Sequence, residues 1–380
     1  MLESLNKIDT QELKDAHAEA NEVKGLINQL IADIAQFRDE RINALYYNIW
    51  YQGTVNQCTG SAVQFLIERL QSDSVQDKDE LLLLLAYVAR GNSYADVEQD
   101  AIESEEQASQ EREWVQNAHN AVAAGVPVYL DLLKHEEASV RTCAAYTLAC
   151  FKEHACDIIP QLHSCIDTEE DELAKSSMLL CLAAFTESAG FLGKAAPKRG
   201  VGIPAWGAGN PHHPLFPLED GKPPICQQLL TEITNQQTTS LVKLAASMAL
   251  ARLTKENTPP EALHVLVDTI VEPESIKDKY VELPWANMDV VGDTSRSLYA
   301  LGPGAGRIAI PILTEALRTA NAPNALRVAD ALLHVAFNGE LVNTDITAQT
   351  LTDEQRLVLT AIANSDCAWV IDIINIGKAA

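Results

Sequence analysis

The sequence predicts an all-α protein, an α-solenoid in which pairs of antiparallel helices stack one on the next. Two observations carry this prediction. A helical hairpin pattern occurs twice between Gly125 and Ala184, and parts of it return later in the chain. Hydrophobic residues make up 47% of the chain but aromatic residues only 6%, which suits closely packed helices better than sheets. Because one such hairpin cannot bury its own apolar face, neighbouring copies must stack.

The repeat is defined by residues that return at equal spacing. The correspondences are Val126-Pro127 with Ile159-Pro160, Leu133 with Ile166, Val140 with Leu173, and Ala144-Ala145 with Ser177-Met178. In each copy the first helix is predicted to open with its proline, at Pro127 and at Pro160, where the missing N–H costs nothing. An acidic turn follows, and then a second helix whose small residues permit close packing.

Residues 1–117 are predicted to form N-terminal capping helices and degenerate repeats, ahead of two clean repeats at 118–187. Apolar residues recur at helical spacing from Leu13 to Ile34, behind a capping residue at Asp9. Four aromatic residues lie between positions 46 and 51, among them Trp50. They either anchor the first repeat or form a partly exposed recognition patch.

Two further stretches of this N-terminal region need an interpretation. Gly53, Gly60 and Ser61 are expected to break the helical pattern, and Leu81–Ala89 is expected to form a helix after them. Asp96–Glu113 holds eight acidic residues and one arginine, and it is either a solvated helix or a flexible acidic excursion.

Residues 225–380 are predicted to contain further repeats and a C-terminal cap. The pattern of the second helix returns at 242–246 and 326–329, with a weaker copy at 295–298. Gly302–Gly306 is rich in glycine but lacks a preceding strand and a Lys-Ser/Thr ending. It is therefore predicted to be a turn between helices and not a phosphate-binding loop.

The repeats resemble HEAT repeats. The residues that carry the resemblance are Val126-Pro127-x2-Leu130-x-Leu132-Leu133 and Ala138-Ser139-Val140-Arg141-x2-Ala144-Ala145-x2-Leu148, and it extends over roughly residues 118–340. The pattern is most similar to the bacterial phycobilisome-lyase-type HEAT-like repeats, and residues 48–67 resemble the start of stand-alone bacterial HEAT-repeat proteins of unassigned role. The resemblance implies a right-handed α-α superhelix of HEAT-like helix pairs that presents a surface to partners. It does not imply a reaction.

Two insertions interrupt the predicted repeats. The Gly/Pro-rich insertion at 188–224 holds seven glycines and seven prolines, and the second lies at Glu272–Gly292. Irregular stretches of this length in a repeat array are usually functional or disordered. The insertions either cover apolar or acidic surface of their own chain or form a recognition edge. The residues predicted to bind a partner are Trp206, His212, His213, Trp285 and Trp50.

No catalytic residue, metal site or cofactor is predicted. His212-His213 lacks a further ligand at helical spacing, so it does not complete a metal site. A bilin-lyase-like enzyme or enzyme subunit is suggested by the name of the repeat family alone. Eight cysteines without CxxC pairing read as reduced core residues. The N-terminus lacks a signal pattern and no apolar run could span a bilayer, so a cytoplasmic location is expected.

The charge restricts the predicted partners. The formal net charge is −25, from 53 acidic and 28 basic residues. Such a surface repels phosphates and anionic lipids, so neither nucleic acid nor membrane is an expected partner. It either favours a basic partner or serves only solubility. Arg141, Lys243 and Arg327 occupy equivalent repeat positions and are predicted to pair with carboxylates of neighbouring repeats.

The sequence therefore predicts a non-catalytic protein–protein interaction scaffold or adaptor that binds another protein through its concave face or its loop-bearing edge. One alternative is an acidic immunity or inhibitor protein that neutralises a basic toxin. The other is the lyase-like role. The oligomeric state is left open.

Overall fold

The computed structural model describes residues 49–51, 53–57, 59–72, 75–93, 96, 104–185, 224–287, 289–301, 303–320, 322–337 and 351–365. Within these ranges the ordered elements are helices, apart from one two-stranded hairpin, so the predicted all-α class is confirmed. The right-handed sense of the stack stays a prediction. The chain groups into two compact units, residues 1–210 and 211–380, and the boundary falls inside the predicted 188–224 insertion.

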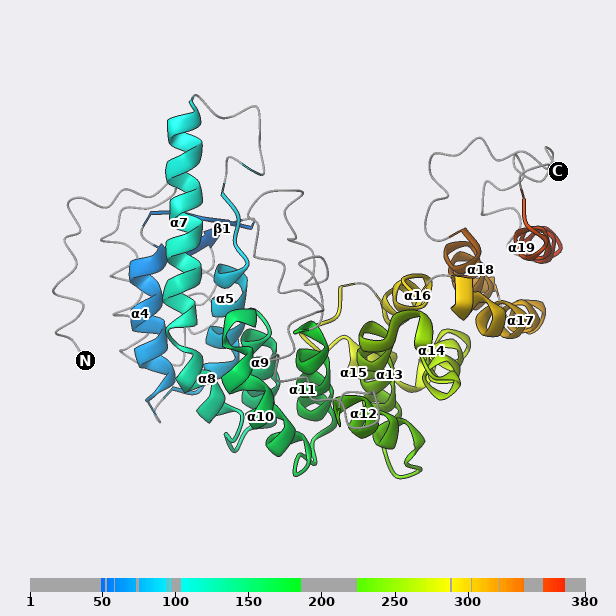
Figure 1. The fold of residues 1–380 in the computed structure, drawn as a ribbon, viewed down its shortest axis with the longest axis horizontal. Helices are drawn as coiled ribbons and strands as arrows, with labels where there is room; N and C mark the ends of the chain where they lie inside the picture. The colour runs from blue at the N-terminus through cyan, green and yellow to red at the C-terminus, as the bar shows by residue number, and fades with distance from the viewer. Residues whose placement is uncertain are drawn as a thin grey trace. The chain divides into compact units, whose positions relative to one another are not determined.

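Unit 1 is built from helix hairpins in two layers. Helices α5, α9 and α11 lie side by side in one row, and α4, α7, α8 and α10 pack against that row (Figure 1). The elements are β1 (Trp50–Tyr51), β2 (Thr54–Val55), α4 (Thr59–Leu70), α5 (Lys78–Ala89), α7 (Glu105–Ala123), α8 (Val126–Leu132), α9 (Ala138–Leu148), the 3-10 helix η3 (Lys152–His154), α10 (Ala155–Ile166) and α11 (Glu172–Ala184).

The row α5–α9–α11 forms the core of unit 1. Helix α9 is buried at every position from 142 to 149, and α11 from 176 to 184, so neither helix has an exposed face there. Two hydroxyl groups make hydrogen bonds that cross between these helices, whereas the buried Ser176 hydroxyl group of α11 has no partner within the described residues. Ser177 Oγ donates to the carbonyl oxygen of Thr142 at 2.7 Å, and Thr147 Oγ1 lies 2.9 Å from that of Leu82. Small side chains and these two cross-helix hydrogen bonds therefore allow the three helices to pack closely.

A short hairpin precedes the first helix of the row. Strands β1 and β2 pair antiparallel, and Gly53 in the turn between them has φ +97°, a conformation that favours glycine. Asn92 ties the hairpin to the end of α5, because its N–H donates to the Gly53 carbonyl oxygen at 2.7 Å. The prediction that Gly60 and Ser61 break the helical pattern is wrong. Both lie in the first turn of α4, where Gly60 is in van der Waals reach of the α7 backbone.

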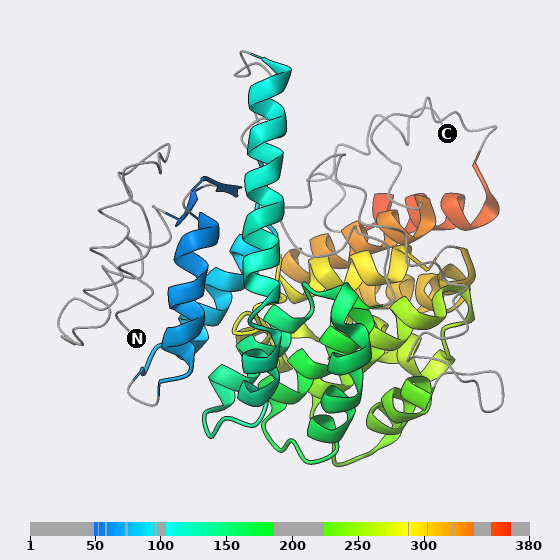
Figure 2. The ribbon, with the colours of Figure 1, turned by 60° about the vertical axis from the view of Figure 1, so that its left-hand side comes forward.

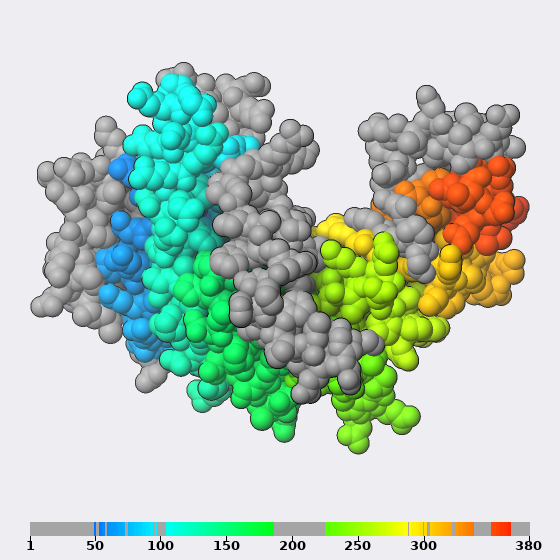
Figure 3. Space-filling view, in the orientation of Figure 1, coloured from blue at the N-terminus to red at the C-terminus, as the bar shows by residue number. Residues whose placement is uncertain are grey.

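Helix α7 resolves the two alternatives for the acidic stretch over the part that the structure describes. It begins with Ser104, whose side chain accepts from Gln107 N–H at 3.2 Å, and continues for 19 residues. The solvated helix is thus confirmed for 105–113. Its first half extends past the ends of α4 and α5, and one face of it lies on the surface (Figures 2 and 3). The predicted helix at 13–34 lies outside the described residues.

Two predictions about helix starts need correction. Pro127 does lie in the first turn of α8, but Pro160 lies inside α10, which begins five residues earlier at Ala155. The Pro160 ring is exposed, and the apolar face of α10 provides the packing that outweighs one missing backbone hydrogen bond. The predicted turn at 302–306 is also wrong, because α17 begins at Pro303. Ala305 and Ala309 are buried there, and their packing offsets the cost of glycine in a helix.

Unit 2 repeats the two-layer arrangement. Helices α13, α16 and α18 form one row, α12, α14 and α17 form the other, and α19 packs on α17 and α18 (Figure 1). The predicted second-helix patterns at 242–246, 295–298 and 326–329 all lie in the first row. The elements are α12 (Pro224–Thr234), α13 (Ser240–Thr254), η4 (Lys255–Asn257), α14 (Pro260–Val271), η5 (Pro273–Ser275), α15 (Lys277–Tyr280), α16 (Val290–Tyr299), α17 (Pro303–Thr319), α18 (Ala322–Phe337) and α19 (Asp353–Ala363).

Candidate interaction surface

Ten carboxylates of unit 1 lie where three of its hairpins turn. The turns α4–α5, α8–α9 and α10–α11 lie along one edge of the unit, at the bottom of Figure 1. We call this surface the acidic edge. Its carboxylates are Asp77, Asp79, Glu80, Glu136, Glu137, Asp167, Glu169, Glu170, Asp171 and Glu172.

Three successive turns come together at this edge because the helices that follow them run parallel. The first two turns lie near each other because α5 and α9, the helices that follow them, pack side by side. The second and third turns are joined by an ion pair between Arg141 and Glu169. The acidic edge is therefore continuous and not a set of separate turns.

The ion pair between Arg141 and Glu169 forms a clamp between neighbouring hairpins. Arg141 Nε and Nη2 donate to the two carboxylate oxygens of Glu169 at 2.6 and 2.8 Å. Its Nη1 donates to the carbonyl oxygens of His135 and Glu136 at 2.8 and 2.9 Å. The side chains are 17% and 6% exposed. Burial is the largest single influence and acts to raise the Glu169 pKa. The Arg141 hydrogen bonds and charge, together with the N–H groups of Asp171 and Glu170, outweigh it and hold that pKa below its ordinary value.

Part of the acidic edge has a structural role. Besides Glu169 in the clamp, Asp171 caps α11, since its Oδ1 accepts from the N–H groups of Leu173 and Ala174 at 3.0 Å. Carboxylates near a helix N-terminus also stabilise its dipole. Glu136, Glu137 and Glu170 differ from these: they are exposed, and Glu137 makes no capping hydrogen bond although it occupies the N-cap of α9.

The clamp confirms one sequence prediction, and unit 2 gives a second case. Arg141 pairs with a carboxylate of the neighbouring repeat, and Arg327 Nη2 lies 3.5 Å from Asp289 Oδ2 at the start of α16. Lys243 makes no ion pair within 4 Å among the residues that the structure describes. The predicted pairing therefore holds for Arg141 and Arg327 and is not seen for Lys243.

A second polar cluster lies at the opposite end of the α5–α9 row. His119 of α7 faces two acceptors: its Nδ1 lies 3.0 Å from the Ala89 carbonyl oxygen and its Nε2 lies 3.0 Å from Glu153 Oε1. Only the imidazolium form donates to both. Burial lowers the His119 pKa, but these hydrogen bonds outweigh it and the net pKa is raised. The Glu153 pKa is lowered, because its hydrogen bonds and the nearby histidine charges outweigh the effect of burial.

Arg90 completes this end of unit 1. Its Nη1 hydrogen-bonds to the Tyr146 hydroxyl group, and its Nε lies 3.2 Å from Cys150 Sγ. Burial raises the Cys150 pKa more strongly than Arg90 lowers it, so Cys150 is a neutral thiol at physiological pH and not a reactive thiolate. The cluster holds α5 and α9 together and offers no nucleophile.

The structure separates the residues that the sequence predicts to bind a partner. Trp206, His212 and His213 lie outside the described residues. Trp50 is half-buried and stacks on Tyr87 of α5 with ring centroids 5.1 Å apart, which matches its alternative role as an anchor of the first repeat. Trp285 is only 9% exposed in unit 2, which argues against it as an exposed anchor. Whether any of these residues binds a partner stays a prediction.

The second insertion is compact where the structure describes it. Its short helices η5 and α15 and the following turns bury Tyr280, Leu283 and Trp285. The Tyr280 hydroxyl group and the Asn287 N–H both donate to Asp293 Oδ2 at 3.0 Å, which fixes the insertion to the first turn of α16. Burial and the Asp293 charge raise the Tyr280 pKa well above its ordinary value. The second insertion is an irregular segment, as predicted, and these buried contacts order it.

The described residues contain no disulfide, no metal-binding cluster and no membrane-spanning helix. All six described cysteines are free. Cys143, Cys165, Cys181 and Cys226 are buried, as the prediction of core residues requires, whereas Cys150 is partly buried and Cys156 is exposed and does not fit it. No group of three or more His, Cys, Asp or Glu side chains in these ranges is arranged to hold a metal ion. No helix in them combines the length and apolar character needed to cross a membrane.

Comparison with known proteins identifies no relative that informs function. No family model and no curated protein matches the chain. The chain is similar to the crystal structure of an engineered protein, a target of the Northeast Structural Genomics Consortium, at 16% sequence identity and a TM-score of 0.36. That similarity covers 94% of this chain and 92% of the other. A TM-score of this size carries no conclusion for this protein, which its described helices define as an all-α protein of stacked hairpins.

Proposed function

We propose that the protein is a non-catalytic interaction scaffold of the HEAT-repeat type, and that it binds a basic partner protein through the acidic edge of unit 1. The observation that carries the proposal is the continuity of that edge over three successive turns. The edge is predominantly acidic, with ten carboxylates against Lys78, Lys134, Arg141 and Lys175. Such a surface, spaced by stacked hairpins, suits an extended basic surface or segment, and its field speeds encounter with such a partner.

The buried rows support the choice of this edge. Helices α9 and α11 have no exposed face over 142–149 and 176–184, so they leave little described surface for a partner to contact. The turns, in contrast, expose Glu80, Glu136, Glu137, Asp167 and Glu170. The edge is also rigid, because the Arg141–Glu169 clamp fixes the second turn against the third. A preorganised charged surface loses less entropy on binding than a mobile one.

The proposal is tested by charge reversal with a matched control. Glu136, Glu137 and Glu170 are changed together to Lys on the full chain. The control changes three exposed acidic residues of unit 2 to Lys: Glu256, Glu261 and Glu354. Both variants carry the same net charge, so a difference between them reports the place of the charge and not its total.

Partners are captured on the wild-type chain, identified by mass spectrometry and purified, and their dissociation constants are then measured at low and high salt. We expect a partner of basic net charge whose affinity falls as salt screens the interaction, since the Debye length shrinks from about 8 Å at 0.15 M to about 3 Å at 1 M. The edge variant should bind at least tenfold more weakly, while the control binds like the wild type. Equal binding by both variants, or affinity independent of salt, would refute the proposal. A basic toxin among the partners would specify the immunity-protein alternative.

A further inference from the structure

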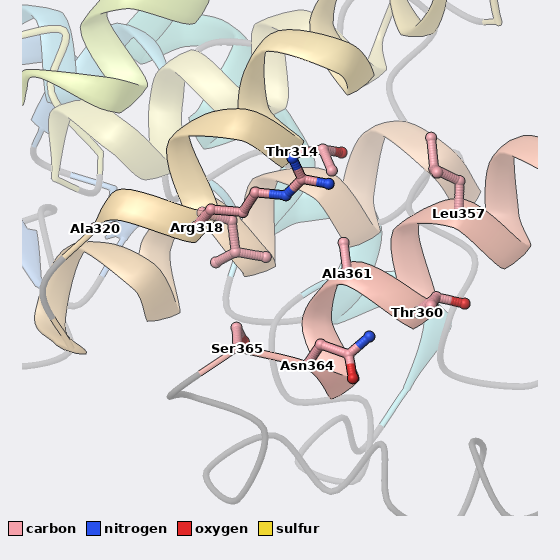
Figure 4. Close-up of a pocket in the computed structure, with 9 residues that line it drawn as sticks. Thr314, Arg318, Ala320, Leu357, Thr360, Ala361, Asn364 and Ser365 are labelled. Atoms are coloured by element: carbon pink, nitrogen blue, oxygen red, sulfur yellow. The ribbon is translucent and has the colours of Figure 1, made fainter.

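Unit 2 contains a pocket of about 280 Å³ between α17 and α19 (Figure 4). Its volume lies just below the usual range for small-molecule sites, about 300–1,000 Å³, so it suits a compact ligand. Its residues come from one face of each helix and the turns that follow. They are Thr314, Leu317, Arg318, Ala320, Leu357, Thr360, Ala361, Asn364 and Ser365.

The pocket lining contains a cation and polar groups but no acidic side chain. Arg318 contributes a cation and Asn364 an amide, and none of the nine lining residues is acidic, although the chain carries 53 acidic residues. The Arg318 guanidinium group uses Nη1 for Glu315, at 2.8 Å on the same helix, and Nε and Nη2 make no hydrogen bond or ion pair among the described residues. Leu317, Leu357 and Ala361 supply apolar wall. The pocket therefore offers hydrogen-bond donors at one part and aliphatic surface at another.

Thr314 gives the independent indication of a ligand. It is 8% exposed, and its hydroxyl group has no hydrogen-bond partner within the described part of the chain. Helical threonines elsewhere in the protein donate to the carbonyl oxygen four residues earlier, at 2.8 Å in Thr142 and 2.7 Å in Thr360. Thr314 makes no such bond, and its buried hydroxyl oxygen belongs to a residue that lines the pocket (Figure 4). A buried hydroxyl group without a partner is costly, so such groups call for an explanation.

We infer that this pocket binds a small monocarboxylate with a short aliphatic chain. The carboxylate is placed to accept from Nε and Nη2 of Arg318, in the forked geometry that arginine offers to such groups. Thr314 donates to the ligand once its side chain rotates, because its hydroxyl oxygen is covered in the ligand-free structure, and the aliphatic chain packs on Leu317 and Leu357. A single negative charge suits the site, because one cation partly neutralised by Glu315 in an acidic protein does not favour a dianion. The inference concerns unit 2 alone and does not depend on the acidic edge of unit 1.

The test uses the full chain and butyrate, hexanoate and hexanamide as probes, measured by ligand-observed NMR and titration calorimetry. We expect hexanoate to bind more tightly than butyrate, and hexanamide at least tenfold more weakly than hexanoate. Arg318→Gln should weaken hexanoate binding by about tenfold or more, because a hydrogen bond to a charged group is lost. Arg307→Gln is the matched control, since Arg307 lies exposed on the same helix outside the pocket, and it should leave binding unchanged.

Thr314→Val separates the role of the hydroxyl group from a folding defect. We expect it to weaken hexanoate binding severalfold while the ligand-free protein keeps or gains thermal stability, because an unpartnered hydroxyl group contributes no internal hydrogen bond. The exposed Thr319→Val serves as its control. The inference is overturned if hexanoate does not bind at millimolar concentration, if Arg318→Gln binds it like the wild type, or if Thr314→Val unfolds at markedly lower temperature without ligand.

Discussion

The clamp between Arg141 and Glu169 is expected to be the most costly of the described ion pairs to break, because its side chains are only 17% and 6% exposed. Arg141→Met keeps most of the aliphatic stem but removes four hydrogen bonds, two of them to a carboxylate that is only 6% exposed. Removing one partner of a buried pair costs about 3–5 kcal/mol, because the other charge is left uncompensated. We expect about 3 kcal/mol, at the low end of this range, since Glu169 Oε1 still accepts from the Asp171 N–H at 2.9 Å.

The assay is urea denaturation at pH 7, with the free energy of unfolding obtained by linear extrapolation. Glu315→Gln is the control, because the Arg318–Glu315 pair has side chains 70% and 69% exposed and should contribute less than about 1 kcal/mol. A double-mutant cycle with Glu169→Gln should give a coupling free energy of at least about 1 kcal/mol. If Arg141→Met costs no more than the control does, the reasoning from burial and geometry is wrong.

The same clamp has a defined pH dependence. The pKa of Glu169 is held below its ordinary value in the folded protein, so the unfolded chain takes up a proton first as the pH falls. The contribution of the clamp is therefore complete above pH 4.5, the ordinary pKa, and is lost as the pH falls through the folded pKa. The difference between wild type and Arg141→Met should narrow in acid. A difference that stays constant down to pH 3 would contradict this account.

Two further predictions concern unit 1. His119→Gln should destabilise the protein more at pH 6 than at pH 8.5. The raised His119 pKa gives stability that is complete below the ordinary value of 6.5 and is lost as the pH rises through the folded pKa. Thermal melts at both pH values check this, and Glu153→Gln should reduce the pH dependence. Gly125→Ala should lower the free energy of unfolding by at least about 2 kcal/mol in urea denaturation. A Cβ atom at this position would lie 2.3 Å from the hydroxyl oxygen of Tyr129. That hydroxyl group is buried and hydrogen-bonded to the Val122 carbonyl oxygen at 3.0 Å. Near-wild-type stability of Gly125→Ala would show that Tyr129 can move aside.

The helix pattern was predictable because each hairpin buries a periodic apolar face. The repeat through Val140 and Leu173 identified α9 and α11, and the pattern at 242–246 identified α13. Helix boundaries failed where packing outweighs local propensity. Pro160 and the glycines after Pro303 signal a helix start or a turn in isolation, but both lie in helices whose apolar faces are buried.

The candidate sites were predictable only in part. The acidic turns and the pairing of Arg141 were visible in the sequence, because they follow from residues at fixed repeat positions. The pocket between α17 and α19 left no signal in the sequence. Its residues come from two helices that are far apart along the chain, and each residue taken alone is an ordinary helix residue. Thr314 becomes notable only when its hydroxyl group is found to lack a partner. Trp285 was predicted as an exposed binding residue because it lies in a predicted loop. The sequence alone does not reveal that its ring is buried.

The cysteines differ in exposure, so their rates of reaction with a thiol reagent can report local unfolding of unit 1. Among the described thiols, Cys156 on α10 is exposed, whereas Cys181 lies in the part of α11 that solvent does not reach. A thiol reagent should therefore modify Cys156 at once, and reach Cys181 only when α11 separates from its neighbours. The ratio of the two rates would measure how often the core of unit 1 comes apart, without a label, a tag or an introduced residue.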